Sequence, residues 1–418
     1  MGSPNRHTSV AQFEGTPVRR FYSGPNLDRA VAIADLRART HKLMPRFVLE
    51  YLEGGSEDEA TLFREREAFA EWRFMPHTLV DESHVDLTTP IIGKPAPMPL
   101  LVAPTGLNGL FRHHADIQLA QGAAQVSTPF IQSTMSTDTM EDVAKVPSLR
   151  HWWQLYVFGG DEIWQELLRR AEACGCEALV LTTNSQLFGN REWDARTRAT
   201  RTRPSNSTIF DAARHLRWFA GTLATHGMPE FANIIDFVPK GQRGFFSSAF
   251  WVRDRMPRSL SWDTVAKIRD RWKKPFFIKG ILNLDDVRAA LEAGVDGIML
   301  GSHGGRQMDW AISALDILPE ARRIVGDLAA LYVSGGIRRG TDMLKARALG
   351  ADAVMTGRAT LYGLCAGGAD GVKRAIEILR DETANALEQM GVPSLGKLGP
   401  DILRRLDPSP MPRHHPSA

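Results

Sequence analysis

Short apolar runs alternate with amphipathic segments along most of the chain. Each run is bordered by Gly, Pro or polar residues, which is typical of the buried strands of a parallel sheet. Helical spacing follows several runs, as in 261–272, where Ser261 is a candidate N-cap, and in 283–294, where Asn283 is a candidate N-cap and Gly294 a stop. Eight such runs begin at Pro99, Pro129, His151, Ala178, Pro275, Gly297, Ala330 and Ala353.

This order of elements predicts an α/β protein with a single (β/α)8 TIM barrel in residues 28–400, an N-terminal helical extension and a long loop after the fourth strand. A doubly wound open sheet is the competing architecture. It is disfavoured because no G-x-G-x-x-G follows the first strand and the glycines cluster after several different strands. Residues 1–27 are polar and rich in Gly and Pro, and the chain from about Asp407 is polar and rich in Pro, so we expect both ends to be flexible, with an N-terminal arm in 1–27 and a C-terminal tail in 401–418.

The segment 196–257 breaks the alternation. Its apolar residues lack sustained helical or strand spacing, so we expect a mobile, partly ordered lid over the active-site mouth rather than part of the core. A membrane-surface patch and a subunit contact are the alternatives. The segment interleaves Arg196, Arg198, Arg201 and Arg203 with the later aromatic residues Trp218, Phe219, Phe231, Phe245, Phe246 and Trp251.

Composition narrows the class of protein. With 43% hydrophobic and 24% charged residues, the 418-residue chain is typical of soluble globular proteins, and its net charge of +3 predicts no nucleic-acid partner. The three cysteines have no framework spacing, and we find no signal peptide and no membrane-spanning apolar run, so we expect a cytoplasmic protein, with peripheral membrane contact through 196–257 as the less favoured alternative. No metal site is expected, because no H-E-x-x-H motif, cysteine-pair series or acidic cluster occurs.

The predicted strand ends supply a candidate site. In a parallel barrel the polar residues at the carboxyl ends of the strands converge, whereas those at the other end serve stability. The set is cationic and includes one histidine, which indicates an anionic ligand. Its members are Gln154, Tyr156, Thr182, Lys279, His303, Arg306, Gly335, Gly336, Arg338, Gly357 and Arg358.

The segment GSHGGRQMD, which starts at Gly301, is the most informative. Glycines beside a histidine allow close approach of the backbone to a ligand and positive φ angles. His303, with Arg306 three residues later, could supply a base and an anion clamp, which suits removal of a proton from a substrate that carries a carboxylate. A structural histidine is the alternative.

The last two strand-to-helix turns predict a phosphate site. The segments SGGIRRGTD, from Ser334, and TGRATLYG, from Thr356, combine glycine amides and a helix N-terminus with Arg338 or Arg358. Lys279 ends an apolar strand, so its ammonium should lie in the barrel mouth beside an anionic group. Ordinary glycine turns with solvated arginines, and an interior salt bridge for the lysine, are the alternatives.

These motifs resemble the FMN-dependent 2-hydroxy-acid oxidising family, which includes glycolate oxidase, lactate oxidase, lactate monooxygenase, flavocytochrome b2 and mandelate dehydrogenase. The resemblance covers about residues 28–400 and rests on SHGGRQMD, SGGIRRGTD, WQLYV, FIKGI and GNREWD. The segments LEYLEGGSEDE, PLLVAPTGLNG and GRATLYGL are most similar to mandelate dehydrogenases.

The resemblance implies FMN as cofactor and a small 2-hydroxy acid, with an aromatic (S)-2-hydroxy acid favoured, as the substrate that is oxidised to a 2-keto acid. It implies His303 as base, Arg191 and Arg306 as carboxylate clamps, and Tyr51 and Tyr156 as hydrogen-bonding groups for the substrate. It also implies a homotetramer, and Gly106 favours a dehydrogenase over an oxidase.

The flavin contacts implied by the resemblance come from most of the strands. Lys279 would lie by N1 and O2 of the flavin, where it would stabilise the reduced anionic ring. The backbone of Ala103, Pro104 and Thr105 would face N5, while Ser133, Gln154 and Thr182 would bind the isoalloxazine. Arg338, Gly357 and Arg358 would bind the ribityl phosphate, and Ser334, Gly335 and Gly336 would form the cofactor-binding turn beside them.

Three positions depart from the family pattern. Asn184 replaces the aspartate partner of the base, Ser334 replaces an aspartate at the ribityl-binding turn, and Gly301 and Ser302 replace the usual Ser-Asn before the histidine. A carboxylate about 4 Å from an imidazolium is worth on the order of 4 kcal/mol at an effective dielectric of ~20, and asparagine cannot supply that charge. A flavoenzyme of the same fold that acts on a specialised biosynthetic intermediate, and a flavin-binding protein of low activity, are therefore alternatives.

Overall fold

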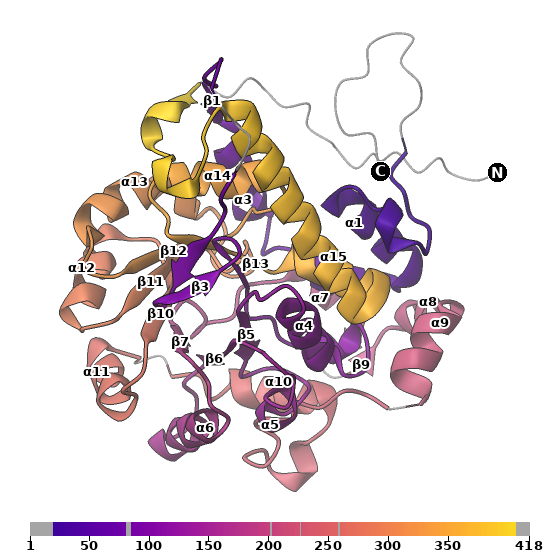
Figure 1. Ribbon diagram of the computed structural model, residues 1–418. Helices are drawn as coiled ribbons and strands as arrows, with labels where there is room; N and C mark the ends of the chain where they lie inside the picture. The colour runs from indigo at the N-terminus through magenta and orange to yellow at the C-terminus, as the bar shows by residue number, and fades with distance from the viewer. Residues whose placement is uncertain (1–19, 81–84, 201–202, 226, 258–259, 407–418) are drawn as a thin grey trace.

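Eight parallel strands close into a barrel in the computed structural model, which describes residues 20–80, 85–200, 203–225, 227–257 and 260–406 (Figure 1). The strands follow the chain around the ring, and the last pairs with the first, so the predicted single TIM barrel is confirmed. Each strand lies within its predicted run: β4 (Leu100–Val102), β5 (Phe130–Ser133), β6 (His151–Leu155), β7 (Leu179–Thr182), β10 (Phe276–Ile281), β11 (Gly297–Leu300), β12 (Ala330–Ser334) and β13 (Ala353–Thr356).

The barrel interior is a packed core at the amino ends of the strands. The rings of Trp152, Phe277 and Tyr332 meet there, with centroids 5.0 Å apart for Trp152 and Phe277 and 5.2 Å apart for Phe277 and Tyr332. Ile91, from the hairpin of β2 (Thr89–Ile91) and β3 (Lys94–Ala96), is buried in the same cluster. Since this end is filled, the open carboxyl ends are left to hold a ligand.

Helices surround the barrel: α4 (Ala115–Ala124), α5 (Met140–Val143), α6 (Asp161–Ala173), α11 (Trp262–Arg271), α12 (Leu284–Glu292), α13 (Ala314–Val325), α14 (Gly340–Ala348) and α15 (Arg358–Met390). The predicted limits of α12 are confirmed, because the Asn283 side chain accepts from the Asp285 amide at 2.8 Å and Gly294 has a positive φ. Ser261 precedes α11, but its side chain makes no capping hydrogen bond.

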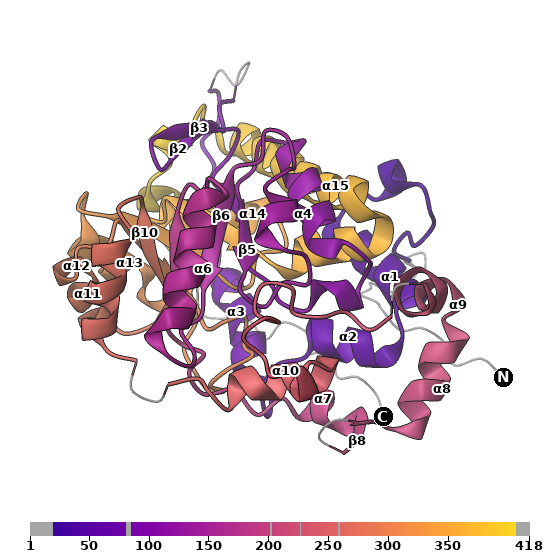
Figure 2. The same ribbon diagram turned by 90° about the horizontal axis from the view of Figure 1, so that it is seen from below.

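The predicted N-terminal extension comprises η1 (Leu27–Arg29), α1 (Ile33–Leu43), α2 (Arg46–Glu53) and α3 (Ala60–Ala70). Figure 2 shows α2, α3, α7 (Glu192–Arg196) and α10 (Phe245–Arg253) at one end of the barrel and the β2–β3 hairpin at the other. The helices therefore cover the end at which the predicted site lies.

The predicted boundary at residue 400 is wrong. After η5 (Leu395–Lys397) and η6 (Pro400–Ile402), β14 (Leu403–Arg405) pairs antiparallel with β1 (Trp72–Phe74), and Arg405 forms an ion pair with Glu71. These contacts bring the chain up to residue 405 into the fold. The predicted flexibility of 1–19 and 407–418, and Arg201, lie outside the described residues.

The expectation that 196–257 lies outside the core is also wrong. Trp218, Phe231 and Trp251 are buried, and the Trp218 indole packs edge-on against Phe47 and donates to Leu110 O at 2.8 Å. The segment folds into short elements, each of which buries only a few apolar side chains, so the spacing along the sequence shows no sustained period. They are β8 (Arg198–Thr200), β9 (Arg203–Pro204), α8 (Asn206–Arg214), α9 (Leu216–Trp218), the π-helical turn η3 (Phe219–Ala224), η4 (Lys240–Gln242) and α10.

Candidate active site

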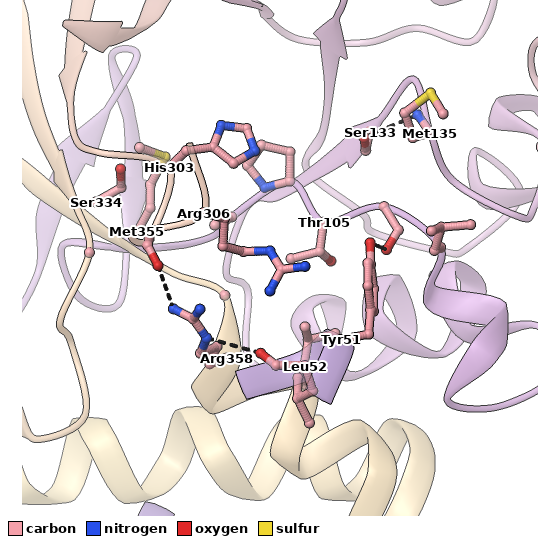
Figure 3. Close-up of a pocket in the computed structure, with 18 of the residues that line it drawn as sticks. Tyr51, Leu52, Thr105, Ser133, Met135, His303, Arg306, Ser334, Met355 and Arg358 are labelled. Carbon is pink, nitrogen blue, oxygen red and sulfur yellow. Dashed lines mark hydrogen bonds between the residues drawn. The ribbon is translucent and has the colours of Figure 1, made fainter. Parts of the chain in front are cut away.

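A cleft at the carboxyl ends of the barrel strands gathers most of the predicted site residues (Figure 3). It encloses about 1280 Å³ of empty space, part of it open to solvent. Its lining includes Tyr51, Ala103, Pro104, Thr105, Ser133, Tyr156, Arg191, Lys279, His303, Arg306, Ser334, Gly335, Gly336, Arg338, Gly357 and Arg358. Gln154, Thr182 and Asn184 are not part of this lining.

His303 lies on a tight loop after β11. It has a φ of +61°, and Gly304 and Gly305 also have positive φ, a run that only glycines tolerate easily. Its Nδ1 lies 3.2 Å from Asn184 Oδ1 and 3.1 Å from Ser185 Oγ, and its Nε2 lies 3.4 Å from the Tyr156 hydroxyl. The histidine is therefore held from one side of the ring and faces the cleft with the other.

Asn184 sets the proton position on the imidazole. Its Nδ2 donates to Gly301 O at 3.2 Å, which turns its Oδ1 toward His303 to accept from Nδ1–H. Nε2 is then unprotonated and able to accept a proton. Ser185 was not predicted as a site residue, because no motif marks it beyond its place next to Asn184.

The electrostatic surroundings keep His303 neutral. Burial holds its pKa well below the ordinary value of 6.5, and the positive charges of Lys279, Arg191 and Arg306 lower it further. Within the described residues, no carboxylate hydrogen-bonds to the ring. An anionic ligand in the cleft would be attracted by the same cations.

Two arginines approach each other beside His303. Arg306 lies 4.9 Å from the centroid of the Tyr51 ring, donates to Gly54 O at 2.5 Å and has its Nη2 3.6 Å from Asp194 Oδ2. Arg191 donates through Nε to Arg306 O at 3.1 Å. Burial, and then the charge of Arg306, lower the pKa of Arg191 to about 10. Such a pair suits a carboxylate, which can accept from both guanidinium groups.

The cleft fits a flavin. Buried polar atoms without a protein hydrogen-bond partner are found on two residues of the lining, Thr105 (Oγ1) and Thr356 (Oγ1), and a heterocycle rich in donors and acceptors could satisfy them. A third such atom, Gln154 Nε2, lies outside the lining but belongs to a side chain that contacts Ser133 of the lining. Gln154 Oε1 accepts from Ser133 Oγ at 3.0 Å, which leaves the amide nitrogen for another partner. Gly357 is the N-cap of α15, so the unpaired amides of this helix N-terminus can bind a phosphate.

Arg358 has protein partners for most of its donors. Its guanidinium donates to Leu52 O at 3.0 Å, Gly304 O at 2.9 Å and Gly54 O at 3.1 Å, so it ties α2 to the loop that carries His303. Arg338 has one such bond, from Nη1 to Ile337 O. Its role and that of Arg358 at a phosphate stay predictions.

Lys279 lines the cleft, and the charge of Glu65, which is not part of the lining, acts on it from behind. Burial lowers the pKa of Lys279 to about 8, while the charge of Glu65 acts in the opposite direction. Glu65 is buried, and this desolvation raises its pKa to about 7. The sequence analysis missed Glu65, which stands among four consecutive charged residues that resemble a solvated helix face.

Comparisons with known proteins agree with this geometry. The family model described as FMN-dependent dehydrogenase matches residues 40–405. The chain is 38% identical to (S)-mandelate dehydrogenase of Pseudomonas putida over 373 residues, which are 89% of this chain and 93% of that protein. It is 37% identical to a putative L-lactate dehydrogenase of Mycobacterium tuberculosis over 388 residues, which are 91% of this chain and 92% of that protein.

A solved structure has the same fold. The crystal structure of the monotopic membrane protein (S)-mandelate dehydrogenase superposes with a TM-score of 0.85 at 37% identity and covers 90% of this chain and 99% of that one. The match of the family model over most of the chain, the relatives and the flavin-sized cleft agree. The chain belongs to the family of FMN-dependent dehydrogenases and oxidases of 2-hydroxy acids.

Proposed function

We propose that this enzyme oxidises an aromatic (S)-2-hydroxy acid to the 2-keto acid, with His303 as the base. The observation that carries the choice of substrate is a set of apolar side chains that line the same cleft as His303 and the two partly buried arginines, Arg191 and Arg306; we call this set the apolar wall. Three aromatic rings and three smaller or flexible apolar side chains suit a phenyl group better than the methyl group of lactate. The wall consists of Leu107, Phe111, Met135, Phe188, Phe231 and Ala249.

The residues around the cleft have different roles in the proposed oxidation. Bound FMN supplies the two-electron acceptor. Arg191 and Arg306 bind the substrate carboxylate, and the Tyr156 hydroxyl, which burial keeps protonated by raising its pKa to about 12, hydrogen-bonds the substrate oxygen. His303 Nε2 takes the proton from the substrate, while Asn184 and Ser185 orient the ring through Nδ1.

For the flavin we propose the contacts that the motifs imply. The backbone of Ala103, Pro104 and Thr105 and the ammonium of Lys279 would hold the flavin ring, and Arg338 with the amides at Gly357 would hold the phosphate. Gln154 binds the ring through the amide nitrogen that lacks a protein partner. Thr182 pairs with Lys279 where β7 lies against β10, and we propose that it also contacts the flavin ring.

A substrate panel tests the proposal. Purified FMN-loaded protein is mixed anaerobically with (S)-mandelate, 4-hydroxymandelate, lactate and glycolate, and flavin reduction is followed by absorbance. We expect the aromatic acids to give the higher reduction rate per concentration of substrate. A preference for lactate or glycolate would contradict the apolar wall as the specificity determinant.

Asn184 favours a second candidate function. Because a neutral amide stands where the family has a carboxylate, the enzyme could act on a specialised biosynthetic intermediate that carries its own charge near His303, or bind flavin with little turnover. Failure of all four acids to reduce the flavin would favour these alternatives.

Gly106 supports a dehydrogenase rather than an oxidase. A Cβ at this position would lie 2.9 Å from the Cβ of Met135, so a larger residue requires a shift of the loop after β5. We expect little reoxidation by oxygen, measured as the rate at which the reduced enzyme regains its absorbance in air.

We also propose peripheral contact with a membrane through α8 and α9. Figures 1 and 2 place both helices at the edge of the molecule, where Ile209, Phe210 and Leu216 are exposed next to Arg214 and Arg217. In the described residues no helix is long and apolar enough to cross a bilayer. Co-sedimentation with anionic vesicles, lost when Ile209 and Leu216 are replaced by serine, is the expected result. A protein that stays in the supernatant would contradict the membrane contact and favour the cytoplasmic location.

The homotetramer stays a prediction, which light scattering can test.

A further inference from the structure

Glu65 is a buried carboxylate behind the flavin side of the cleft. It lies on α3, where Arg66 and Glu67 are exposed and Glu65 alone of the three is buried, with 2% of its surface accessible. Removing a carboxylate from water is unfavourable unless partners compensate. Its partners therefore indicate its role.

Two serines from the loop after β11 bind Glu65. Ser302 Oγ donates to one carboxylate oxygen and Ser313 Oγ donates to the other at 3.2 Å. Ser302 Oγ also accepts from the Gly305 amide at 3.0 Å. Since Ser302 directly precedes His303, the carboxylate fixes the base of the loop that carries the histidine.

The turn after β12 makes room for the same carboxylate. Gly335 has a φ of +114°, and a Cβ on it would collide with the Glu65 carboxylate. Next to it stands Ser334, at the position where the resemblance implies an aspartate, and its Oγ donates to Leu300 O at 3.2 Å. The turn after β12 has no carboxylate of its own at this position, but the Glu65 carboxylate, on α3, lies beside it.

The charged groups that face Glu65 come from two other elements. Lys279, on β10, is one of them: the charge of Glu65 partly offsets the lowering of the lysine pKa by burial. Arg358, at the start of α15, is the other, and its charge favours the ionised form of Glu65. The loop after β11 contributes the two serine hydroxyls, and the turn after β12 faces it with the backbone of Gly335 and Gly336.

We propose that Glu65 is a positioning residue of the flavin site, which opposes the charge of Lys279 and thereby sets the midpoint potential of FMN according to its own protonation. The inference rests on the proposed place of Lys279 at the flavin ring. An ionised Glu65 disfavours the negative charge that the flavin gains on reduction, whereas a protonated one does not. The proton that neutralises Glu65 comes from solvent, and the electrons come from the reductant.

Burial places this protonation in an accessible range. It raises the pKa of Glu65 to about 7, so the carboxylate is mostly neutral at pH 6 and mostly ionised at pH 9. The midpoint potential of FMN in the wild type should therefore fall more steeply between pH 6 and 9 than proton uptake by the flavin itself accounts for.

The test is a redox titration of the FMN-loaded protein with dithionite and a reference dye at pH 6 to 9, with FMN affinity measured in parallel. Glu65→Gln removes the charge and keeps one of the two oxygens that accept from the serines. We expect its potential to be more positive than that of the wild type at pH 9, by at least a tenfold change in the reduced-to-oxidised ratio, which is about 30 mV for a two-electron couple. The difference should vanish toward pH 6. The control Glu67→Gln, exposed on the same helix, should follow the wild type at every pH.

Two further variants separate the ways of failing. Lys279→Met should lower the potential if the lysine lies at the flavin. If it does so while Glu65→Gln follows the wild type at every pH, the role of Glu65 is overturned and the place of Lys279 stands. If neither variant moves the potential, the proposed place of Lys279 fails and the inference fails with it.

If Glu65→Gln does not fold or does not hold FMN, Ser302→Ala replaces it. Loss of a donor to the ionised carboxylate raises the pKa of Glu65, so the steep part of the potential curve should move to higher pH. A merely structural role for Glu65 would leave that inflection in place, and an unmoved inflection would overturn the inference.

Discussion

Replacing Asn184 by aspartate should raise the rate at which a 2-hydroxy acid reduces the flavin. The Asn184 Oδ1 lies 3.2 Å from His303 Nδ1, so a carboxylate of nearly the same shape would meet the ring in the same geometry. As the proton leaves the substrate, His303 becomes an imidazolium, and the new charge stabilises that form. The Asn184 amide oxygen can accept a hydrogen bond from His303 Nδ1–H, but the amide supplies no negative charge.

The size of the effect follows from that distance. Two unit charges whose centres are about 4 Å apart attract by about 4 kcal/mol at an effective dielectric of ~20. Since about 1.4 kcal/mol corresponds to a tenfold change, the ceiling is roughly a thousandfold in rate. The observed gain should be smaller, because Lys279 and the arginines also attract the carboxylate and a gain in base strength is only partly expressed in the transition state.

Stopped-flow reduction by mandelate from pH 5 to 9 measures the effect. In the wild type the neutral imidazole persists to low pH, because burial and four neighbouring cations hold the pKa of His303 well below 6.5. The rate should therefore stay flat with respect to this group across most of the range. In Asn184→Asp the pKa rises, so the acid limb should move toward neutral pH while the plateau rises.

The control is Asn190→Asp, which adds the same charge at an exposed position near the cleft. It should leave the plateau and the acid limb unchanged. A wild-type rate that is already fast on mandelate, with the same plateau and the same pH profile in Asn184→Asp, would show that the imidazolium needs no carboxylate and would refute the reasoning.

Three further predictions concern the clamp, the wall and the pH dependence of stability. Arg191→Met should raise KM for mandelate roughly tenfold to a hundredfold, because a charge-assisted hydrogen bond is worth about 1.5–3 kcal/mol; steady-state kinetics with an unchanged KM would contradict the clamp. Phe231→Ala should lower kcat/KM for mandelate and leave that for lactate nearly constant, whereas equal losses would point to a general disturbance. His151 is buried beside Gln132, and burial lowers its pKa to about 4, so below pH 6.5 the unfolded chain binds the additional proton and stability falls as pH falls toward 4. Urea unfolding at pH 5 and 7.5 should show a loss of about 2 kcal/mol at the lower pH, and less of it in His151→Gln.

The barrel could be predicted because each strand has a recognisable pattern within its own stretch of sequence. A strand buried on both faces needs a continuous apolar run, and the Pro and Gly residues at its borders mark where pairing stops. The eight runs found by this criterion are the eight barrel strands. Their carboxyl ends then had to meet, which brought His303, Lys279 and Arg338 to one cleft.

The residues that the sequence did not reveal depend on contacts between distant segments. Glu65 and Ser302 are separated by 237 positions, and nothing local distinguishes the buried glutamate from the exposed charges beside it. Trp218 and Trp251 lie in short elements that each bury little, so their spacing has no period. The donors of Arg358 are directed to carbonyls of α2, which only the packing of the N-terminal extension determines.

Anaerobic mixing of mandelate with the FMN-loaded wild type and with His303→Ala decides whether the cleft performs the proposed reaction. We expect rapid bleaching of the flavin in the wild type and a rate lower by several orders of magnitude in His303→Ala, with FMN still bound, because the base acts in the transition state and not in cofactor binding. Equal bleaching in both proteins would contradict His303 as the base. No bleaching of the wild type by any 2-hydroxy acid would contradict the reaction itself.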